Sequence, residues 1–325
     1  MPELAEVLQT TSATLAVKSD PSSKKENLKL VELDKGLKFF KDRCIVHVAN
    51  RPMLRQKAYE LLYKIYSEKG YARHKDSNLW VSIFDAHPET TTFMAVNAQG
   101  HIEGALTVVF DSPMGLPADE LYRKEIDLVR KSGGKICEIV SLGISKTAKS
   151  PSKILASFVY CAYLLTWPTK KASTLVITVN PKHEAFYCKK MLFEKIGPER
   201  SFDKVNGAPS VLLQVPIVKY SKLTPKDRVF PFFMIKHSDQ KELELAKKIE
   251  TMIRPMSSEE FFTFFIEKTD IWERAWPSQK TFIKSVYPAN EINHYEVSRA
   301  LARGISKKNR LSDDNRNSNA KIAQR

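Results

Sequence analysis

The middle of the chain alternates between segments that are typical of β-strands and segments that are typical of α-helices. Residues 136–145 and 174–180 are apolar and rich in β-branched side chains, as strands are. Residues 152–166 carry apolar side chains three and four positions apart, the period of one helix face, and residues 182–191 form a shorter helical segment. This succession predicts an α/β fold. The chain has 325 residues, which is long enough to bury a substantial core.

Further strands and helices are predicted on both sides of this segment. A helix over residues 51–70 has apolar side chains at helical spacing and stops at Gly70. The turn Ala98-Gln99-Gly100 joins two apolar segments into a hairpin. The predicted strands lie at 44–48, 91–97, 101–110 and 210–218, and the other predicted helices lie at 119–131, 240–253 and 258–268.

Changes in composition divide the chain into four parts. Residues 1–27 are rich in Ser, Thr and Lys without a sustained period, which predicts a flexible leader. Residues 28–219 contain the strands and helices of the main domain. Residues 220–298 are mostly helical in period and are interrupted by prolines, so we expect a helical extension. Residues 299–325 are predicted to form a basic, disordered tail.

The charge of the chain is strongly positive. Its formal net charge is +15, and the tail at 299–325 carries eight Lys or Arg residues against two Asp residues. The simplest interpretation is a solvated end. The tail could also touch an anionic membrane surface or an acidic protein, and nucleic acid is the partner that we favour least.

Other features favour a cytoplasmic enzyme. No apolar run reaches the roughly 18–20 residues of a membrane span. The first 17 residues lack the basic start and apolar core of a secretory signal. The cysteines show no metal-ligand spacing, so we interpret them as reduced packing residues and expect no metal. They are Cys44, Cys137, Cys161 and Cys188.

One acidic residue stands out in the strand at 136–145. Strict alternation places Glu138 on the same face as Val140, Leu142 and Ile144, as its only charged member. A carboxylate in apolar surroundings is costly unless it is paired or its pKa rises. A raised pKa suits a general base near pH 7. The alternative is an edge position, or a glutamate paired with a buried Arg or Lys.

The start of the helix at 152–166 suits an anion. Pro151 fits a first helical turn, and Ser150 or Ser152 could cap it. The free amides of a helix start attract phosphate, and Lys149 and Lys153 would strengthen that attraction.

The strand at 174–180 ends in Asn180-Pro181, where the next helix begins. Tyr187 lies two turns into that helix, and its phenol could protonate a leaving thiolate. Tyr187 could instead be a core residue of an amphipathic helix. We interpret His183 as a solvent-facing helix residue rather than a catalytic one.

Together these segments resemble the GNAT acyltransferases, and more specifically the N-acyl amino acid synthases of the Fee type, relatives of the acyl-homoserine lactone synthases. The resemblance covers residues 50–215. The segments that carry it are Tyr59–Tyr66 with Glu68–Tyr71, Asp111–Asp119, Glu138–Leu142, Val179–His183, Gly197–Arg200 and Val205–Pro209.

The resemblance implies a GNAT fold, with a central mixed, mostly antiparallel sheet flanked by helices. It also implies transfer of a long-chain fatty acyl group from acyl-phosphopantetheine to the amine of an amino acid. The pantetheine arm would lie between the strands at 136–145 and 174–180, and no cofactor would be bound permanently. Glu138 would be the base and Tyr187 the group that assists the leaving thiolate. The expected donor-binding residues are Val140, Leu142, Ile144, Lys149, Ser152, Lys153, Thr178 and Asn180.

Two departures from the family patterns refine this expectation. The segment 146–152 contains no glycine, so its side chains would hinder close approach of a pyrophosphate. This favours an acyl carrier protein over CoA as donor. A lysine patch could steer that acidic partner; it comprises Lys149, Lys153, Lys182, Lys189 and Lys190.

Leu142 occupies the position where the lactone synthases have Arg in a Glu-x-Ser-Arg motif, which weakens a homoserine-lactone interpretation. The alternatives are an acyl-homoserine lactone synthase that uses S-adenosylmethionine, and a GNAT-shaped binding module without turnover.

Overall fold

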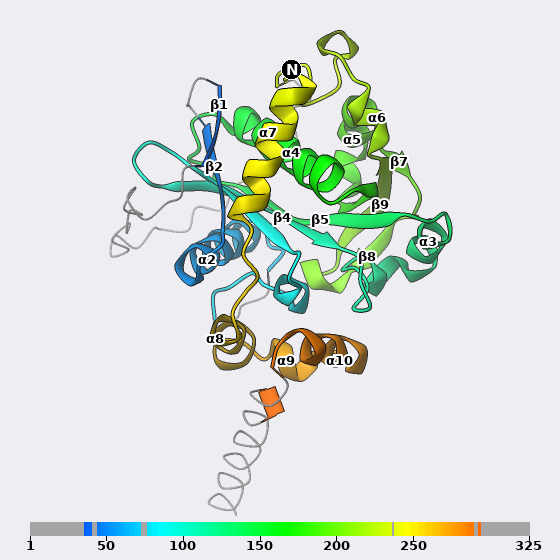
Figure 1. The fold of residues 1–325 in the computed structure, drawn as a ribbon. Helices are drawn as coiled ribbons and strands as arrows, with labels where there is room; N and C mark the ends of the chain where they lie inside the picture. Colours follow the sequence, from blue (N-terminus) through cyan, green and yellow to red (C-terminus); the bar gives the residue numbers. More distant parts are fainter. Residues whose placement is uncertain (1–35, 41–43, 73–76, 236, 289–291, 294–325) are drawn as a thin grey trace, which may run out of the picture. The chain divides into compact units, whose positions relative to one another are not determined.

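The structure is a computed structural model that describes residues 36–40, 44–72, 77–235, 237–288 and 292–293 (Figure 1). The predicted leader at 1–27 and the tail at 299–325 lie outside these ranges. The chain divides into two compact units, Met1–Arg274 and Ala275–Arg325. No described helix is both long and apolar enough to cross a membrane. The predicted boundary at residue 219 and the tail boundary stay predictions.

The first unit is built on a mixed sheet. Among the described residues it has nine strands in the order β1-β2-β3-β4-β5-β6-β9-β7, with β8 also paired to β9. The pair β5–β6 is parallel, and the other pairs are antiparallel. The expected mixed, mostly antiparallel sheet is confirmed. The strands are β1 Leu37–Phe39, β2 Cys44–Val48, β3 Thr91–Val96, β4 Ile102–Phe110, β5 Lys135–Ile144, β6 Ala172–Val179, β7 Glu194–Lys195, β8 Arg200–Phe202 and β9 Ala208–Pro216.

Helices cover both faces of this sheet. Figure 1 shows α2 on one side of it and α4 with α7 on the other. The described helices of this unit are α2 Pro52–Glu68, α3 Asp119–Lys131, α4 Pro151–Leu164, α5 Glu184–Met191, α6 Val218–Ser221, α7 Asp239–Met252, α8 Ser258–Phe262 and α9 Ile271–Arg274. In the second unit the described helix is α10 Pro277–Val286.

Short helical turns join these elements. The 3₁₀ turns are η2 Ile83–Ala86, η4 Pro181–His183, η5 Asp203–Val205 and η6 Pro225–Asp227. The π turns η3 Leu165–Thr169 and η7 Thr263–Glu267 extend α4 and α8. The helices predicted at 152–166, 182–191 and 258–268 therefore exist, but each includes one such turn.

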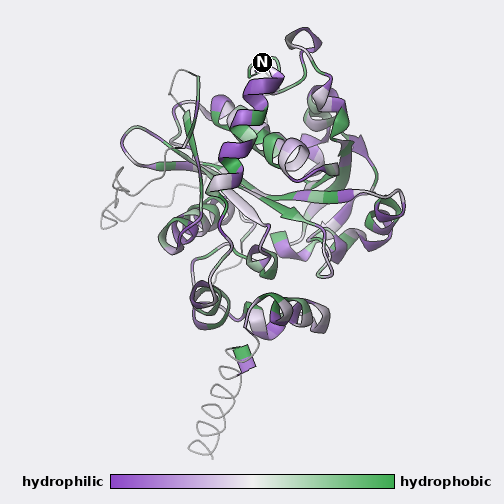
Figure 2. Cartoon of the chain, viewed as in Figure 1, coloured by the Kyte–Doolittle hydropathy of each residue, from purple (hydrophilic) through white to green (hydrophobic). Residues whose placement is uncertain are grey.

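Apolar side chains explain which helix faces the sheet. In α4 every residue from Ile154 to Leu164 is buried, and the helix is hydrophobic along most of its length in Figure 2. In α7 the buried residues Glu242, Ala246, Ile249 and Met252 recur three and four positions apart and so share one face, and hydrophilic residues separate them along the ribbon in Figure 2. Cys44, Cys137 and Cys161 lie in the core beside α4, which confirms their packing role.

The region after residue 219 packs against the sheet and its helices within the first unit. The hydroxyls of Tyr160 and Tyr163, both on α4, donate to the Glu242 carboxylate of α7 at 2.8 and 3.3 Å. Glu242 is buried, so these bonds hold α7 onto α4 in a place where water cannot replace them. On the α2 side, Arg55 pairs with Glu260 of α8.

Glu242→Ala should lower the free energy of unfolding by about 2–3 kcal/mol, because two tyrosine hydroxyls lose their acceptor. Glu244→Ala removes a largely exposed carboxylate of the same helix, which pairs with Lys241, and should change it by about 0.5 kcal/mol or less. Urea unfolding followed by circular dichroism measures both. Equal effects would contradict the role given to Glu242.

Candidate active site

Strands β5 and β6 pair along only part of their length. Their parallel pairing runs from Lys135–Ala172 to Ile139–Ile177 and then stops. Beyond it β5 stays paired with β4 as far as Ile144, and β6 stays paired with β9 as far as Val179. The two strands therefore part, as expected from the resemblance, and each leaves an unpaired edge toward the other.

A bulge in β5 changes which residues share a face. Thr107 of β4 pairs with Ser141 and Val108 pairs with Ile139, so Val140 is the extra residue. Directly paired residues of antiparallel strands lie on the same face. The alternation that put Glu138 on the face of Leu142 is therefore wrong, because the bulge shifts the register by one.

With the bulge, Glu138 shares the α2 face of the sheet with Ser141, whose hydroxyl accepts a hydrogen bond from Trp80 Nε1 at 3.2 Å. Ile139, Leu142 and Ile144 face the core on the α4 side. Where β5 borders the gap, the Glu138 carboxyl thus lies on one face of the sheet and the apolar side chains lie on the other.

The Glu138 carboxyl is buried, with 2% of the residue exposed. Its Oε2 accepts a hydrogen bond from the backbone N–H of Ala118 at 2.9 Å. Burial raises the pKa of Glu138 to about 8, against the lowering effects of the Ala118 N–H and the Lys204 ammonium. Such a group can accept or give a proton near neutral pH.

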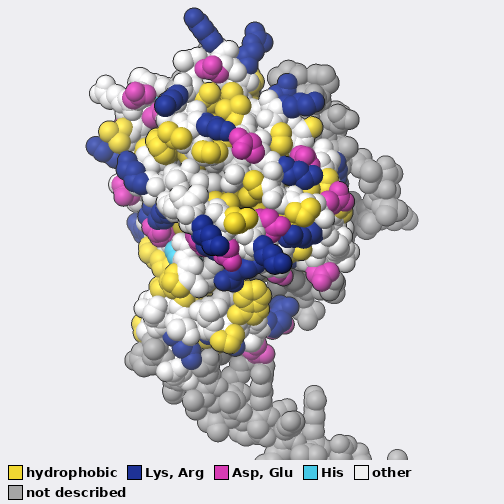
Figure 3. All heavy atoms as spheres, turned by 90° about the vertical axis from the view of Figure 1, so that its right-hand side faces the viewer, with side chains coloured by type: hydrophobic (Ala, Val, Ile, Leu, Met, Phe, Trp, Pro, Cys, Tyr) yellow, Lys and Arg dark blue, Asp and Glu magenta, His cyan; other side chains and the backbone are white. Residues whose placement is uncertain are grey.

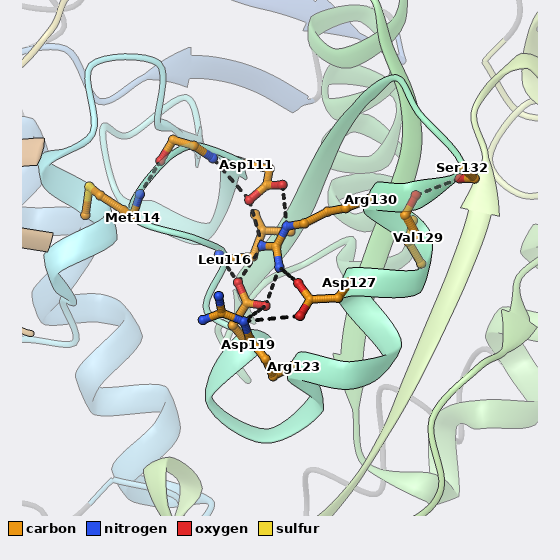
Figure 4. A network of polar contacts seen from close by, with 10 residues as sticks. Asp111, Met114, Leu116, Asp119, Arg123, Asp127, Val129, Arg130 and Ser132 are labelled. Carbon is orange, nitrogen blue, oxygen red and sulfur yellow. Dashed lines mark hydrogen bonds and ion pairs between the residues drawn. The ribbon is translucent and has the colours of Figure 1, made fainter. Parts of the chain in front are cut away.

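The loop that presents the Ala118 N–H is held by Arg130 of α3 (Figure 4). Arg130 donates two 2.8 Å hydrogen bonds to the Asp111 carboxylate and two, of 2.7 and 2.5 Å, to the Asp119 carboxylate. Asp119 also accepts the Leu116 N–H at 2.7 Å. Gly115 has a φ of +76°, and a Cβ there would lie 2.5 Å from the Asp119 carboxylate, so only glycine fits. The Asp111–Asp119 segment, noted from sequence without a role, therefore positions the hydrogen-bond donor to Glu138.

A cavity of about 640 Å³ opens where the strands part. Its lining includes Glu138, together with side chains from both sides of the sheet, so the cavity passes through the gap between β5 and β6. On the α2 side the lining includes Tyr66, Lys69, Trp80, Pro117 and Lys204. On the α4 side it includes Leu155, Val159, Met191 and Phe193.

The structure brings most of the predicted site residues to this cavity. Besides Glu138, the predicted residues that line it are Val140, Leu142, Ile144, Ser152, Thr178, Asn180 and Tyr187. Lys149 and Lys153 do not line it, and the Lys153 ammonium lies 5.6 Å from the centroid of the Phe40 ring. Ser150 precedes α4, but its side chain forms no capping bond. The roles given to these residues stay predictions.

Aromatic residues flank the gap. Burial raises the pKa of Tyr187 to about 12, so its hydroxyl stays protonated and can donate a hydrogen bond. Tyr66 of α2 stacks on Trp80 at a centroid distance of 4.3 Å, and its hydroxyl is 3.5 Å from the Leu142 carbonyl. Trp80 lies outside every strand and helix that the sequence predicts. Tyr66 lies in one of the segments that carry the resemblance to the acyltransferase family, and this resemblance is the sequence signal that points to it.

Two polar residues at the end of β6 face the cavity with different hydrogen bonding. The Thr178 Oγ1 is buried, and it has no hydrogen-bond partner among the described residues. Asn180 caps η4, because its Oδ1 accepts the Lys182 N–H at 3.2 Å. Thr178 thus offers an unsatisfied buried hydroxyl to whatever enters the cavity.

Positive charge gathers near one end of the lining. Lys69 and Lys146 line the cavity, and Lys146 pairs with Glu68 at 3.5 Å. Burial, together with the Lys182 and Lys146 ammonium groups, lowers the pKa of Lys69 to about 8. A bound anion would reduce the repulsion among the ammonium groups of these three lysines.

The interpretation of His183 as a solvent-facing residue is wrong. It is half-buried and lines the cavity. Burial and the nearby lysines lower its pKa to about 4, so it is neutral at pH 7.

The raised pKa of Glu138 makes a prediction about stability. The pKa is about 4.5 for an unperturbed glutamate and about 8 for Glu138 in the folded protein. The protonated carboxyl therefore makes its full contribution to the free energy of unfolding below pH 4.5, and this contribution is lost as the pH rises through 8. The Glu138→Gln variant has a neutral amide side chain at every pH in this range. Its unfolding free energy, relative to wild type, should therefore increase between pH 5 and pH 8 by an amount on the order of 4 kcal/mol.

Chemical unfolding across this pH range measures the difference. Glu120→Gln removes an exposed carboxylate of α3 and is the matched control. The same pH-dependent gain in both variants, or none in Glu138→Gln, would contradict the burial of a protonated carboxyl at position 138.

Comparison with known proteins agrees with this geometry. Residues 57–216 match the family model "N-acyl amino acid synthase FeeM". The structure of FeeM, an N-acyl amino acid synthase from uncultured soil microbes, is similar with a TM-score of 0.50 and 23% identity, over 59% of this chain and 99% of that one. It has the same fold, and the expected GNAT-like architecture is confirmed.

Two further solved structures are more distant. The acyl-homoserine lactone synthase LasI has a TM-score of 0.43 and 14% identity, over 54% of this chain and 90% of that one. TofI, in a ternary complex with an inhibitor and MTA, has a TM-score of 0.41 and 18% identity, over 54% of this chain and 91% of that one. No curated protein matches the sequence. Residues 57–216, just under half of the chain, therefore match the N-acyl amino acid synthase FeeM family model, and this match supports acyltransferase activity.

Proposed function

We propose that this protein transfers a long-chain fatty acyl group from an acyl carrier protein to the amine of an amino acid, by direct attack of the amine on the thioester. The observation that carries this proposal is the buried carboxyl of Glu138 in the lining of a cavity that passes between β5 and β6. A tether threaded through that gap would bring its thioester close to this carboxyl. The apolar lining on the α4 side, which includes Leu155 and Val159, suits a fatty chain.

The acceptor ammonium must lose two protons, one before its nitrogen attacks and one as the amide forms. In the proposed mechanism the ionised Glu138 takes a proton from the acceptor ammonium, directly or through a water, and the amine nitrogen attacks the thioester carbonyl carbon. The new C–N bond gives a tetrahedral oxyanion, which collapses as the C–S bond breaks. The proton that the nitrogen then loses matches the one that the departing thiolate takes up, and Glu138 returns its own proton to solvent, so atoms and charges balance without an oxidant.

Two groups would stabilise the charges that develop. The edge of β5 beyond Ile139 has no strand partner on the β6 side, and its backbone around Val140 and Leu142 could polarise the thioester carbonyl. The protonated hydroxyl of Tyr187 could donate a hydrogen bond to the leaving sulfur.

The end of β6 offers contacts for the pantetheine arm. The Thr178 hydroxyl is buried in the cavity lining without a partner among the described residues, so an amide of the arm could satisfy it. The amide side chain of Asn180 lies at the same end. A hydrogen-bonding tether fits these residues better than a purely apolar ligand does.

The donor phosphate has two candidate locations. The first is the start of α4 with Lys149 and Lys153, as the sequence suggests. The second is the crowded cationic group of Lys69 and Lys146, which line the cavity. The second location is favoured because an anion there would offset the burial and the like charges that together lower the pKa of Lys69.

A carrier protein is acidic and would dock on exposed lysines. Figure 3 shows one face of the protein, on which Lys and Arg side chains are interleaved with Asp and Glu side chains. A docking surface of Lys149, Lys153, Lys182, Lys189 and Lys190 stays a proposal, and a falling association rate at higher salt would support it.

The proposal is tested by incubating the purified protein with acyl carrier proteins that bear long-chain acyl groups and with a mixture of amino acids. Mass spectrometry should detect N-acyl amino acids. Transfer to S-adenosylmethionine with lactone formation would instead identify a homoserine lactone synthase, and no transfer to any amine would contradict the proposal.

Glu138→Gln should lower kcat/KM by about 100- to 10,000-fold, the range for loss of a general base. The wild-type rate should rise with pH up to about 8, because the ionised form of Glu138 is the base. The variant should lose this inflection, whereas Glu120→Gln should keep it. A Glu138→Gln variant with the wild-type rate and pH profile would refute the assignment of the base.

Substitutions at the two candidate phosphate sites separate them. Lys69→Met and Lys146→Met should each raise the KM for the acyl carrier protein by about 10-fold, through loss of a charge-assisted contact, and should leave the KM for the amino acid unchanged. Lys149→Met and Lys153→Met should have smaller effects, because these residues do not line the cavity. The reverse order would place the phosphate at the start of α4.

A further inference from the structure

A second cationic group lies at a different part of the cavity lining. Lys204, on η5 between β8 and β9, is half-buried and lines the cavity together with Glu138. It has no ion pair with any other described residue. The lining that contains the Glu138 carboxyl therefore also contains the Lys204 ammonium group, in addition to Lys69 and Lys146.

The hairpin that carries Lys204 is fixed by several contacts. Asn206 adopts a φ of +59° and donates from its side chain to the Gly70 carbonyl, at the end of α2, at 3.3 Å. The next residue, Gly207, has a φ of +77°, and its carbonyl accepts the Ser201 hydroxyl at 3.0 Å. The turn therefore bridges from β9 to α2, and Lys204 is held at the cavity rather than on a free loop.

The two carboxyl groups whose pKa is affected by the Lys204 charge, those of Asp85 and Glu138, already accept other hydrogen bonds. Asp85 accepts both the N–H and the hydroxyl of Ser82, at 2.8 and 3.0 Å. Glu138 accepts the Ala118 N–H. Burial raises the pKa of both carboxyls and the Lys204 charge opposes that rise, yet neither carboxyl forms a salt bridge with Lys204. The ammonium is thus available to an anion in the cavity.

Lys204 is also distinct from the cationic group proposed for the donor phosphate. The charges that affect Lys69 are those of Lys182, Lys146 and Glu68. The cation that affects Glu138 is Lys204. The cavity lining therefore contains two positive regions, and one of them is associated with the proposed base.

An amino acid carries its ammonium and its carboxylate on the same carbon. Its binding site needs an acidic group and a basic group close together, which Glu138 and Lys204 supply on one lining. We infer that Lys204 binds the α-carboxylate of the acceptor while the acceptor amine faces Glu138, so that Lys204 selects amino acids over amines without a carboxylate. This inference rests on the proposed function.

The experiment compares glycine, leucine and phenylalanine with their primary amides as acceptors, using one long-chain acyl carrier protein. Each amide keeps the amine and the side chain but lacks the carboxylate charge. Because the amines differ in intrinsic reactivity, the readout is the change between variants in the ratio of kcat/KM for acid and amide. Lys204→Met should lower this ratio by about 10- to 100-fold, almost wholly through the acid, and Lys204→Arg should retain most of it.

Lys69→Met is the matched control, because it removes a lysine from the other cationic region of the same lining. It should lower the rates for acid and amide together and leave their ratio unchanged. If Lys204→Met keeps the wild-type ratio, or lowers both rates equally in a folded protein, the inference is overturned.

A binding measurement separates failure of this inference from failure of the proposed function. The N-dodecanoyl derivatives of the same acids and amides are titrated into wild type and Lys204→Met by calorimetry. Wild type should bind the acids at least 10-fold more tightly than the amides, and the variant should lose that difference. If the wild-type protein shows this preference but transfers acyl groups to no acceptor, the proposed function fails and the carboxylate site stands. Equal binding of acid and amide by wild type overturns the inference.

Discussion

The place where the hydrogen bonding between β5 and β6 ends determines the rest of the site. Paired backbone as far as Ile139 and Ile177 holds the two strands in one sheet. Past that point each strand keeps its outer partner, so the gap is framed by rigid elements and not by loops. The free edge of a strand must find other hydrogen-bond partners, and a bound tether with amide groups can provide them. Glu138, one residue before the end of the pairing, is therefore fixed at the entrance to the gap.

The chemistry of Glu138 depends on elements that are distant in sequence. The bulge at Val140 turns its side chain to the α2 face, and the Asp111–Asp119 loop supplies its hydrogen-bond donor. That loop is in turn held by Arg130 of α3. Burial raises the pKa of this carboxyl and the Ala118 N–H lowers it only in part, whereas several such donors would bring the pKa down further. The arrangement thus suits a base that must both take up and release a proton.

Much of the fold could be predicted from the sequence, because long apolar segments with a clear period leave few choices. The hairpin of β3 and β4 and helices α2, α3 and α7 lie where their periods predict. Strands β7 and β8 have two and three residues, too few to show a period. The bulge could not be predicted, since nothing in Val140 itself distinguishes it from its neighbours. Glu138 was recognisable as the one charge among apolar residues, but Lys204 and Trp80 reach the cavity only through tertiary contacts.

In the proposed mechanism the donor's pantetheine arm lies between β5 and β6 beside Glu138. A crystal structure with an acyl-pantetheine analogue, in which a thioether replaces the thioester, tests it most directly. The account predicts that the arm passes between Val140–Ile144 and Thr178–Asn180, contacts the Thr178 hydroxyl, and ends with its sulfur near Tyr187. An analogue bound outside this gap, or strands that close against each other when it binds, would contradict the account.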